Sequence, residues 1–289
     1  MLSRVFQGQF GFRPEFPKEV DTLYMFVCNR CALKHFEPSC VGDEELYKRL
    51  QKFSFYYSEK RPEFAVARKY LRDCKKVLEI GAGAGAFGAT LNHVDYVGLE
   101  FSREAAQRAR TRGLQVECET LEQHLARVGS GQYDAVCAFE VLEHVGNPRE
   151  LLHQAFAALA RGGIAFFSVP NDEAFTRLER NNVLNMPPHH QTRWRKAVFE
   201  YLANIFDVEL VACEREKLAD SDLDVYLNAM LSEAIDALLG RQRRELDPLH
   251  ASLPVRAARK AVTVWLRRGL KEPAIRPDGQ SMAAVLRKR

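Results

Sequence analysis

The sequence predicts an α/β fold of the doubly wound type, in which helices cover both faces of a mostly parallel sheet. Two observations support this prediction. Short apolar stretches alternate with longer helical stretches between residues 61 and 214, and the first apolar stretch, 76–80, runs directly into a glycine-rich turn. Strands that are separated by helices form βαβ units, and the strands of such units are parallel.

The elements follow one another in a regular order from residue 61. The stretches expected to form strands are 76–80, 95–100, 114–118, 133–139, 164–169 and 208–214. The stretches expected to form helices are 61–71, 87–91, 103–112, 121–128, 149–160 and 196–205. Gly113, Gly131 and the segment Arg161-Gly162-Gly163 lie where a helix or a loop must end before the next strand begins.

The flanking regions have other patterns. Residues 1–60 look irregular, apart from a short helical stretch at 43–53. Apolar residues recur at helical spacing over 223–238 and again over 255–270, where they face a basic stripe. We therefore divide the chain into a small irregular N-terminal segment (1–60), a main domain (61–215), a helical insertion that forms a lid or a dimer contact (216–280) and a closing strand (281–289).

Composition and charge restrict the cellular setting. Of the 289 residues, 46% are hydrophobic and 28% charged, and there is neither a membrane-spanning apolar run nor a secretory signal. The seven cysteines are an odd number, which favours reduced thiols and a cytoplasmic location.

The net charge of +4 is unevenly spread along the chain. Residues 241–289 hold 13 Lys or Arg against 4 Asp or Glu. This excess predicts an anionic binding partner or a peripheral membrane contact, with a solvated helix face as the alternative.

The glycine-rich turn is the most informative stretch. Gly81, Gly83 and Gly85 follow an apolar strand that contains Glu79, and Glu100 ends the next strand. Glycines allow a ligand to approach the backbone, and a carboxylate at the end of the neighbouring strand can bind both hydroxyls of a ribose. Taken alone, the motif also fits the dinucleotide-binding pattern of a nicotinamide-dependent oxidoreductase.

Three further features indicate a cofactor other than a nicotinamide dinucleotide. Glu79 is a carboxylate in a strand that should be buried, Tyr133-Asp134 begins a strand that continues into Glu-Val-Leu-Glu-His at 140–144, and paired glycines precede a strand that ends in Pro170-Asn171. Together they resemble class I S-adenosylmethionine-dependent methyltransferases, specifically the group related to ubiquinone-pathway O-methyltransferases.

The resemblance implies a Rossmann-like sheet of seven strands with the last strand antiparallel, and S-adenosylmethionine as the cofactor. It implies that Glu100 binds the ribose and that Glu119 and Thr120 lie near the adenine. It also implies that Phe139 and Glu140 flank the methionine end of the cofactor.

Histidines are the candidates for activating the methyl acceptor. His144 follows a strand on the side where ligands bind in such sheets, and it could act as a general base or simply cap its helix. His189 and His190 follow two prolines in the segment 185–194, which resembles a Pro-Pro-His-His segment found in a branch of these methyltransferases. Either could act as the base, bind the acceptor or cap a helix.

A divalent cation is an alternative way to activate the acceptor. Glu140, Glu143, His144 and His190 form a carboxylate and imidazole set, in which Glu140 and His144 would share one helical turn. Such ligands suit Mg²⁺, Mn²⁺ or another divalent ion that holds a vicinal diol. The set resembles that of ubiquinone-pathway enzymes and of small-RNA 2′-O-methyltransferases.

Cys28 and Cys31, with His35 and Cys40 nearby, raise zinc as a further question. Their spacing resembles the second half of a zinc ribbon at the N-terminus of some sugar C-methyltransferases, whose first cysteine pair is absent here. A structural zinc site needs four ligands. We therefore expect a degenerate, metal-free remnant, with zinc at Cys28 and Cys31 as the alternative.

The leading functional hypothesis is methylation of a hydroxyl on a small or carbohydrate-like acceptor. A sugar C-methyltransferase and a metal-assisted methyltransferase for the 2′-hydroxyl at an RNA end are alternatives. The sequence has no aromatic-rich basic motif of an RNA-binding module, which disfavours nucleic acid. A nicotinamide-dependent oxidoreductase and a catalytically silent binding module are the hypotheses outside this class, and the sequence leaves the oligomeric state open.

Overall fold

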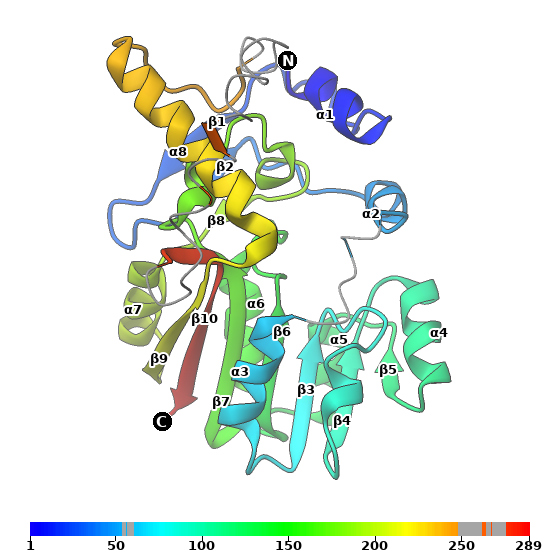
Figure 1. Cartoon of the computed structure of the whole chain (residues 1–289). Helices are drawn as coiled ribbons and strands as arrows, with labels where there is room; N and C mark the ends of the chain where they lie inside the picture. The colour runs from blue at the N-terminus through cyan, green and yellow to red at the C-terminus, as the bar shows by residue number, and fades with distance from the viewer. Residues whose placement is uncertain (54–55, 57–60, 248–261, 264–266, 268–275) are drawn as a thin grey trace.

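A computed structural model describes residues 1–53, 56, 61–247, 262–263, 267 and 276–289 of the chain (Figure 1). Its centre is a seven-stranded sheet with the strand order β5-β4-β3-β6-β7-β10-β9. The strands are β3 (Lys76–Ile80), β4 (Asp95–Leu99), β5 (Gln115–Glu117), β6 (Tyr133–Phe139), β7 (Leu159–Pro170), β9 (Val208–Lys217) and β10 (Asp278–Lys288). β10 is antiparallel to both of its neighbours, whereas β3 to β7 pair in parallel, so the predicted fold class is confirmed.

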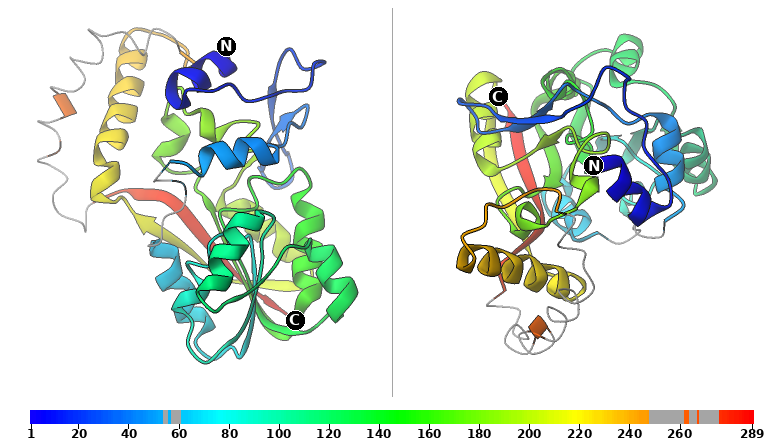
Figure 2. Two further views of the ribbon diagram at one scale, coloured as in Figure 1. Left: turned by 90° about the vertical axis from the view of Figure 1, so that its right-hand side faces the viewer. Right: turned by 90° about the horizontal axis from the view of Figure 1, so that it is seen from above.

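Helices cover both faces of this sheet (Figure 2). One face packs against α3 (Pro62–Leu71) and α4 (Arg103–Thr111). The opposite face packs against α5 (Leu121–Val128), α6 (Pro148–Ala158) and α7 (Lys196–Ile205). Successive strand residues point to opposite faces, so Phe166 lies in one apolar core and Phe167 in the other.

The described residues of the N-terminal segment, 1–53, contain more regular structure than the sequence suggested. They form α1 (Leu2–Phe10), α2 (Glu44–Leu50) and a hairpin of β1 (Tyr24–Val27) and β2 (Lys34–Glu37). The expectation of an irregular segment is therefore wrong for these residues. A second sheet has the order β1-β2-β8, and β8 is the short strand Thr192–Arg193. Its strands are too short for a clear pattern, and one comes from a distant part of the chain.

The second sheet, α1 and α2 lie beyond the carboxyl ends of β3 and β6 (Figure 1). The side chain of Gln191 links the two parts of the chain that build this region. Its Oε1 accepts the N–H of Cys40 at 3.0 Å, and its Nε2 donates to the Cys40 carbonyl oxygen at 2.6 Å. The N-terminal segment is thereby joined to the segment that carries His189 and His190.

Two boundaries within the main domain differ from the prediction. Residues 87–91 do not form an α-helix, because only a 3₁₀ turn, η1 (Gly88–Thr90), follows the glycine-rich loop. The paired glycines do not end a helix before a strand at residue 164, because β7 begins at Leu159. The pairing of β6 with β7 shifts between Tyr133 and Ala135, so Gly162 and Gly163 lie in a bulge of the strand.

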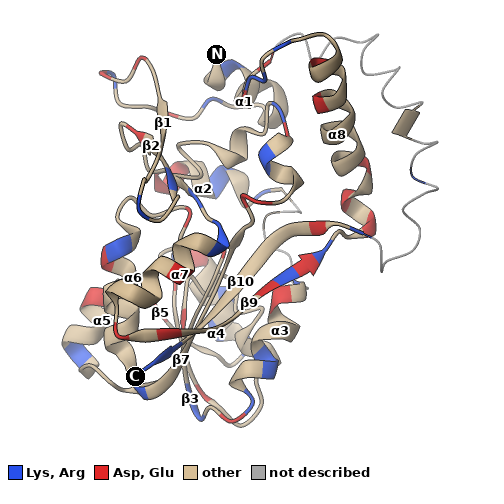
Figure 3. Ribbon diagram, turned by 90° about the vertical axis from the view of Figure 1, so that its left-hand side faces the viewer, with Lys and Arg blue, Asp and Glu red and all other residues tan. Residues whose placement is uncertain are grey.

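The C-terminal part contains the predicted helix 223–238 as α8 (Leu223–Leu238), whose charged residues are all acidic (Figure 3). It packs against the short helix η2 (Phe175–Leu178). The closing strand β10 spans Asp278–Lys288, so it begins three residues before the predicted 281–289. Most of the predicted basic helix 255–270 lies outside the described residues. None of the helices formed by the described residues has the length and apolar character that a membrane crossing needs.

Candidate active site

The glycine-rich loop connects β3 to η1 at the carboxyl edge of the sheet. Gly81, Gly83 and Gly85 have φ angles of 72°, 54° and 78°, in the left-handed region that favours glycine. A Cβ atom on Gly81 would lie 2.7 Å from Cγ2 of Val141. Glycine at this position therefore lets the loop approach the segment that carries Glu140, Glu143 and His144.

Glu100 lies directly after β4 and faces this loop. Its Oε2 accepts the N–H of Gly83 at 2.8 Å, and its Oε1 accepts the N–H of Ser102 at 2.7 Å. Burial raises the pKa of the carboxyl, while the two backbone donors lower it. The carboxylate is thus fixed beside the glycine-rich loop.

Glu79 is a buried carboxylate beneath the same loop. Its Oε2 accepts the hydroxyl of Tyr96, and burial raises the pKa of Glu79 to about 8. Gly88 makes room for the tyrosine, because a Cβ there would lie 2.5 Å from Cζ of Tyr96. The sequence analysis missed Tyr96, whose only signal was a tyrosine in an otherwise apolar strand.

The resemblance also implied Glu119, Thr120 and Phe139 as cofactor-binding residues, and each of these side chains contacts other residues of the protein. The Glu119 carboxylate accepts hydrogen bonds from His124 and Arg127, and the Thr120 hydroxyl accepts the N–H of Gln123 as the N-cap of α5. The ring of Phe139 packs among other buried aromatic rings, including those of Phe64, Phe87 and Phe166.

The segment after β6 is not helical. Residues 140–144 form a turn in which Glu140 has a φ angle of 55°, so the premise that Glu140 and His144 share a helical turn is wrong. Among the described residues, the group of three or more potential metal ligands consists of His144, His189 and His190, and it includes neither Glu140 nor Glu143 of the predicted set. Sequence spacing alone could not place the turn, because its backbone conformation is unusual for glutamate.

The three histidines form a compact cluster. One ring nitrogen of each lies within 4.8 Å of those of the other two. Nδ1 of His144 lies 2.8 Å from the carbonyl oxygen of His189, and Nδ1 of His189 lies 2.8 Å from that of Leu184. Nδ1 of His190 lies 3.2 Å from Oδ1 of Asn185. Because these oxygens only accept, each Nδ1 carries the hydrogen and each Nε2 has a free lone pair.

Burial keeps these rings neutral. It lowers the pKa of His144 to about 4 and lowers those of His189 and His190 well below their usual value. Nε2 of His189 is buried and has no hydrogen-bond partner. The cluster therefore offers unprotonated nitrogens at neutral pH.

Glu143 lies beside the histidine cluster. Its side chain is 1% exposed, and Oε1 lies 3.5 Å from Nε2 of His144 and 4.0 Å from Nε2 of His190. Neither carboxylate oxygen has a hydrogen-bond partner. Burial raises the pKa of Glu143 to about 8, while the charge of Arg61 lowers it. Burial and Glu143 also raise the pKa of Glu140.

Tyr47 on α2 covers the cluster from the N-terminal segment. Its hydroxyl oxygen lies 3.5 Å from Nδ1 of His144, and its ring contacts those of His144 and His189. Tyr56 contacts the His189 ring as well. The sequence analysis missed both tyrosines, because nothing local indicates that residues 47 and 189 meet.

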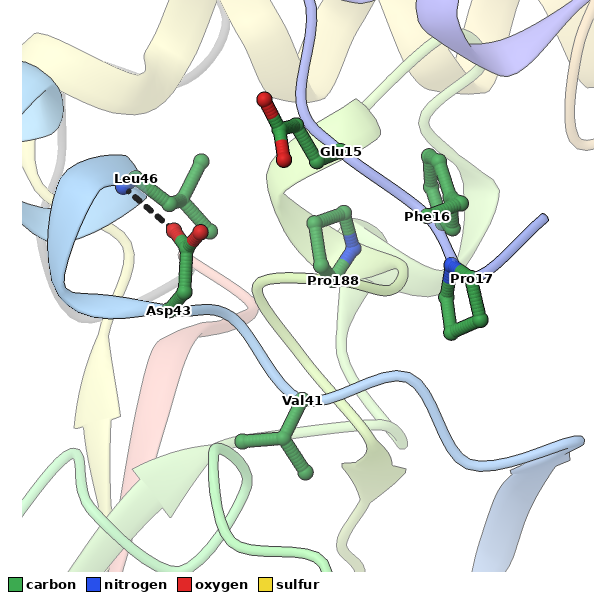
Figure 4. Close-up of a pocket in the computed structure, with 7 residues that line it drawn as sticks. All are labelled: Glu15, Phe16, Pro17, Val41, Asp43, Leu46 and Pro188. Atoms are coloured by element: carbon green, nitrogen blue, oxygen red, sulfur yellow. Dashed lines mark hydrogen bonds between the residues drawn. The ribbon is translucent and has the colours of Figure 1, made fainter.

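A cavity of about 280 Å³ lies next to the N-terminal end of α2, which carries Tyr47 (Figure 4). Its apolar walls are Phe16, Pro17, Val41, Leu46 and Pro188, and its carboxylates are Glu15 and Asp43. Pro188 precedes His189 and Leu46 precedes Tyr47, so the cavity and the histidine cluster are bounded by the same two segments.

Cys28 and Cys31 lie in the loop between β1 and β2. Backbone N–H groups of Arg30 and Cys31 lower the pKa of the Cys28 thiol, and burial raises that of Cys31. Cys40 lies apart, and its thiol donates to the carbonyl oxygen of Pro38. Within the described part of the chain, the two loop cysteines do not belong to a group of three or more potential metal ligands.

Comparison with known protein families agrees with this architecture. Residues 43–207, more than half of the chain, match the family described as "Methyltransferase domain", and the chain belongs to that family. The chain thus contains a methyltransferase domain of the class I S-adenosylmethionine-dependent type.

Part of the chain is also similar to curated enzymes named ubiquinone biosynthesis O-methyltransferase. It is 39% identical over 106 residues to one from Escherichia coli O7:K1 and 35% identical over 105 residues to one from Erwinia tasmaniensis. Each match covers 34% of this chain and 43% of the relative. The chain thus spans less than half the length of these relatives.

Solved structures show the same fold. A SAM-dependent methyltransferase from Archaeoglobus fulgidus has a TM-score of 0.52 and 18% identity, over 84% of this chain and 100% of its own. One from Thermotoga maritima, described as a possible histamine N-methyltransferase, has a TM-score of 0.50 and 17% identity, over 85% and 96%. At such identities the likeness concerns the fold alone.

Proposed function

We propose that this methyltransferase transfers the methyl group of S-adenosylmethionine to a hydroxyl of a small acceptor. The observation that carries this proposal is the buried cluster of His144, His189 and His190 with Glu143, at the carboxyl edge of the sheet. A hydroxyl must lose its proton as it attacks the methyl group, and this cluster supplies unprotonated nitrogens for that step.

We assign cofactor binding to the residues around the glycine-rich loop. Gly81, Gly83 and Gly85 let the cofactor approach the backbone, and Glu100 binds the ribose hydroxyls from its fixed position. Glu79 orients the loop through its hydrogen bond with Tyr96. We keep Glu119 and Thr120 near the adenine and Phe139 and Glu140 near the methionine end as parts of this proposal.

The histidine cluster also suits a divalent cation. Metal-binding histidines commonly donate one ring N–H to an oxygen and present the other nitrogen, and all three histidines here have that arrangement. His144, His189 and His190 would hold the ion, with Glu143 beside them. Three imidazoles favour a transition ion such as Zn²⁺ or Fe²⁺ over Mg²⁺, and the carboxylate of Glu143 beside them suits Mn²⁺ as well. When bound, the ion would act as a Lewis acid that lowers the pKa of the acceptor hydroxyl.

We assign the body of the acceptor to the adjoining cavity. Its volume of about 280 Å³ fits a small molecule, which supports a small acceptor over an RNA end. Apolar walls with two carboxylates suit a ring that carries hydroxyl groups. The partial similarity to ubiquinone biosynthesis O-methyltransferases supports O-methylation.

The test uses the full chain, isotope-labelled S-adenosylmethionine and three probes, namely 4-methylcatechol, dopamine and methyl α-glucopyranoside. We expect labelled methyl on an oxygen of at least one probe, identified by NMR. Phe16→Ala should raise the acceptor KM without changing cofactor affinity, whereas Val225→Ala on α8 should change neither. Methylation found only on nitrogen or carbon would contradict the proposal.

A further inference from the structure

Strand β1 exposes all four of its side chains, and all four are apolar. The exposed fractions are 61% for Tyr24, 39% for Met25, 49% for Phe26 and 51% for Val27. Strands at the edge of a sheet are commonly protected by charges, proline or covering segments, because an open apolar edge pairs with other strands. This strand has no such protection within its four residues.

The outer edge of β1 also presents backbone groups. Cys28 donates its N–H to the carbonyl oxygen of Leu33, which belongs to the ladder with β2. Hydrogen-bonded pairs alternate in an antiparallel ladder, so the N–H and C=O groups of Met25 and Val27 point away from β2. In the part of the chain that the structure describes, no strand pairs with this edge.

We propose that β1 pairs with β1 of a second copy of this chain, in antiparallel orientation about a two-fold axis. The pairing would join the two small sheets into one sheet of six strands. A two-fold interface requires a surface that is complementary to itself, and an antiparallel strand edge meets this requirement. With Phe26 opposite Phe26 of the second copy, Met25 and Val27 exchange backbone hydrogen bonds across the axis.

The charged residues before and after β1 favour antiparallel pairing with a second copy of the chain. Glu19 and Asp21, with Lys18, give the preceding segment a net negative charge, whereas Arg30 follows the strand. Antiparallel pairing brings the negative segment of one copy beside Arg30 of the other at both ends of the contact. Parallel pairing would instead place segments of like charge together.

A four-residue strand pair forms a small interface, so we expect a dissociation constant on the order of micromolar. Sedimentation velocity of the full chain over a wide range of concentration should therefore show a monomer that converts to a dimer. This measurement does not depend on activity, so its outcome is separate from that of the methyl-transfer test.

Two variants test the strand pairing itself. Met25→Pro removes an outward N–H without removing a hydrogen bond to β2, and Phe26→Lys places charges on the two-fold axis. Both should weaken dimerisation at least tenfold, with unchanged circular dichroism. Val225→Lys changes a comparably exposed apolar residue on α8 and should dimerise like the wild type.

Two results would overturn the proposal. One is a wild-type chain that stays monomeric at every concentration, including one that instead sediments with phosphatidylcholine–phosphatidylglycerol vesicles. The other is a dimer whose dissociation constant is the same in the wild type, Met25→Pro and Phe26→Lys.

Discussion

The carboxylate of Glu100 accepts a hydrogen bond from the N–H of Gly83 at 2.8 Å, across the gap between the ends of β3 and β4. The same carboxylate accepts the N–H of Ser102. The protein thus fixes this acidic group beside the glycine-rich loop, where we propose that the ribose of the cofactor binds.

Replacing Glu100 should therefore weaken cofactor binding. A carboxylate that accepts two ribose hydroxyls contributes about 1.5–3 kcal/mol per bond, so Glu100→Ala should lower the affinity for S-adenosylhomocysteine by a factor on the order of 10²–10⁴. Isothermal titration calorimetry measures this affinity. Glu122→Gln, on the exposed face of α5, serves as the control. Unchanged affinity in Glu100→Ala would contradict the ribose assignment.

The buried Glu79 predicts a pH-dependent stability. Its pKa is about 8 in the folded protein against an ordinary value of 4.5, so the folded state binds more protons between these pH values. The contribution of Glu79 to the free energy of unfolding is therefore fully present below about pH 4.5 and is lost as the pH rises through 8. Between these values the free energy of unfolding falls by up to about 1.4 kcal/mol per pH unit.

Glu79→Gln tests that expectation. Its amide oxygen can still accept the Tyr96 hydroxyl but does not ionise, so the variant should gain stability relative to the wild type as the pH rises from 5 to 8. Urea unfolding at several pH values, without cofactor, measures the difference. Glu122→Gln should follow the wild type, and a stability difference that is independent of pH would show that Glu79 does not titrate as described.

Gly81 should tolerate alanine less well than Gly113. Both have positive φ angles, but a Cβ on Gly81 would meet Val141 at 2.7 Å, whereas nothing lies within 4 Å of one on Gly113. Gly113→Ala should cost roughly 1–2 kcal/mol from backbone strain alone. Gly81→Ala should cost about 1–3 kcal/mol more and weaken cofactor binding. Equal losses in urea unfolding would mean that the loop moves freely away from Val141.

Substitutions in the histidine cluster distinguish a general base from a divalent-cation site. If an ion is bound, His144→Ala, His189→Ala and Glu143→Gln should each weaken Mn²⁺ binding in calorimetry, and chelator should abolish activity that Mn²⁺ restores. If His144 acts alone as a base, its replacement should lower kcat by a factor on the order of 10²–10⁴. Activity that is indifferent to chelator would exclude the cation site.

The sequence predicted the centre of the sheet well because β3 and β6 are buried on both faces. Residues 76–80 and 133–139 are apolar apart from Lys76, Glu79 and Asp134, and their limits agree with β3 and β6. The prediction was wrong at β7, because β6 pairs with that strand at Leu159 and again from Ile164, on both sides of Gly162 and Gly163. Tertiary pairing overrides the local tendency of paired glycines to form a turn.

The candidate site was only partly visible in the sequence. The glycine-rich loop and Glu100 belong to consecutive strands, so their proximity followed from the fold. The role of His189 in the cluster depends on the carbonyl oxygen of Leu184, and Tyr47 reaches His144 from a helix about a hundred residues earlier in the chain. Such long-range geometry leaves no periodic signal.

The paired hydrogen bonds between Gln191 and Cys40 have a consequence for protein engineering. They couple the N-terminal segment to the segment with the histidines, although about 150 residues separate the two. A chimaera that exchanged only one of these segments with a homologous enzyme would mismatch the two sides of the cavity between them. If the acceptor binds in this cavity as we propose, altering acceptor preference in this scaffold calls for transplanting both segments together.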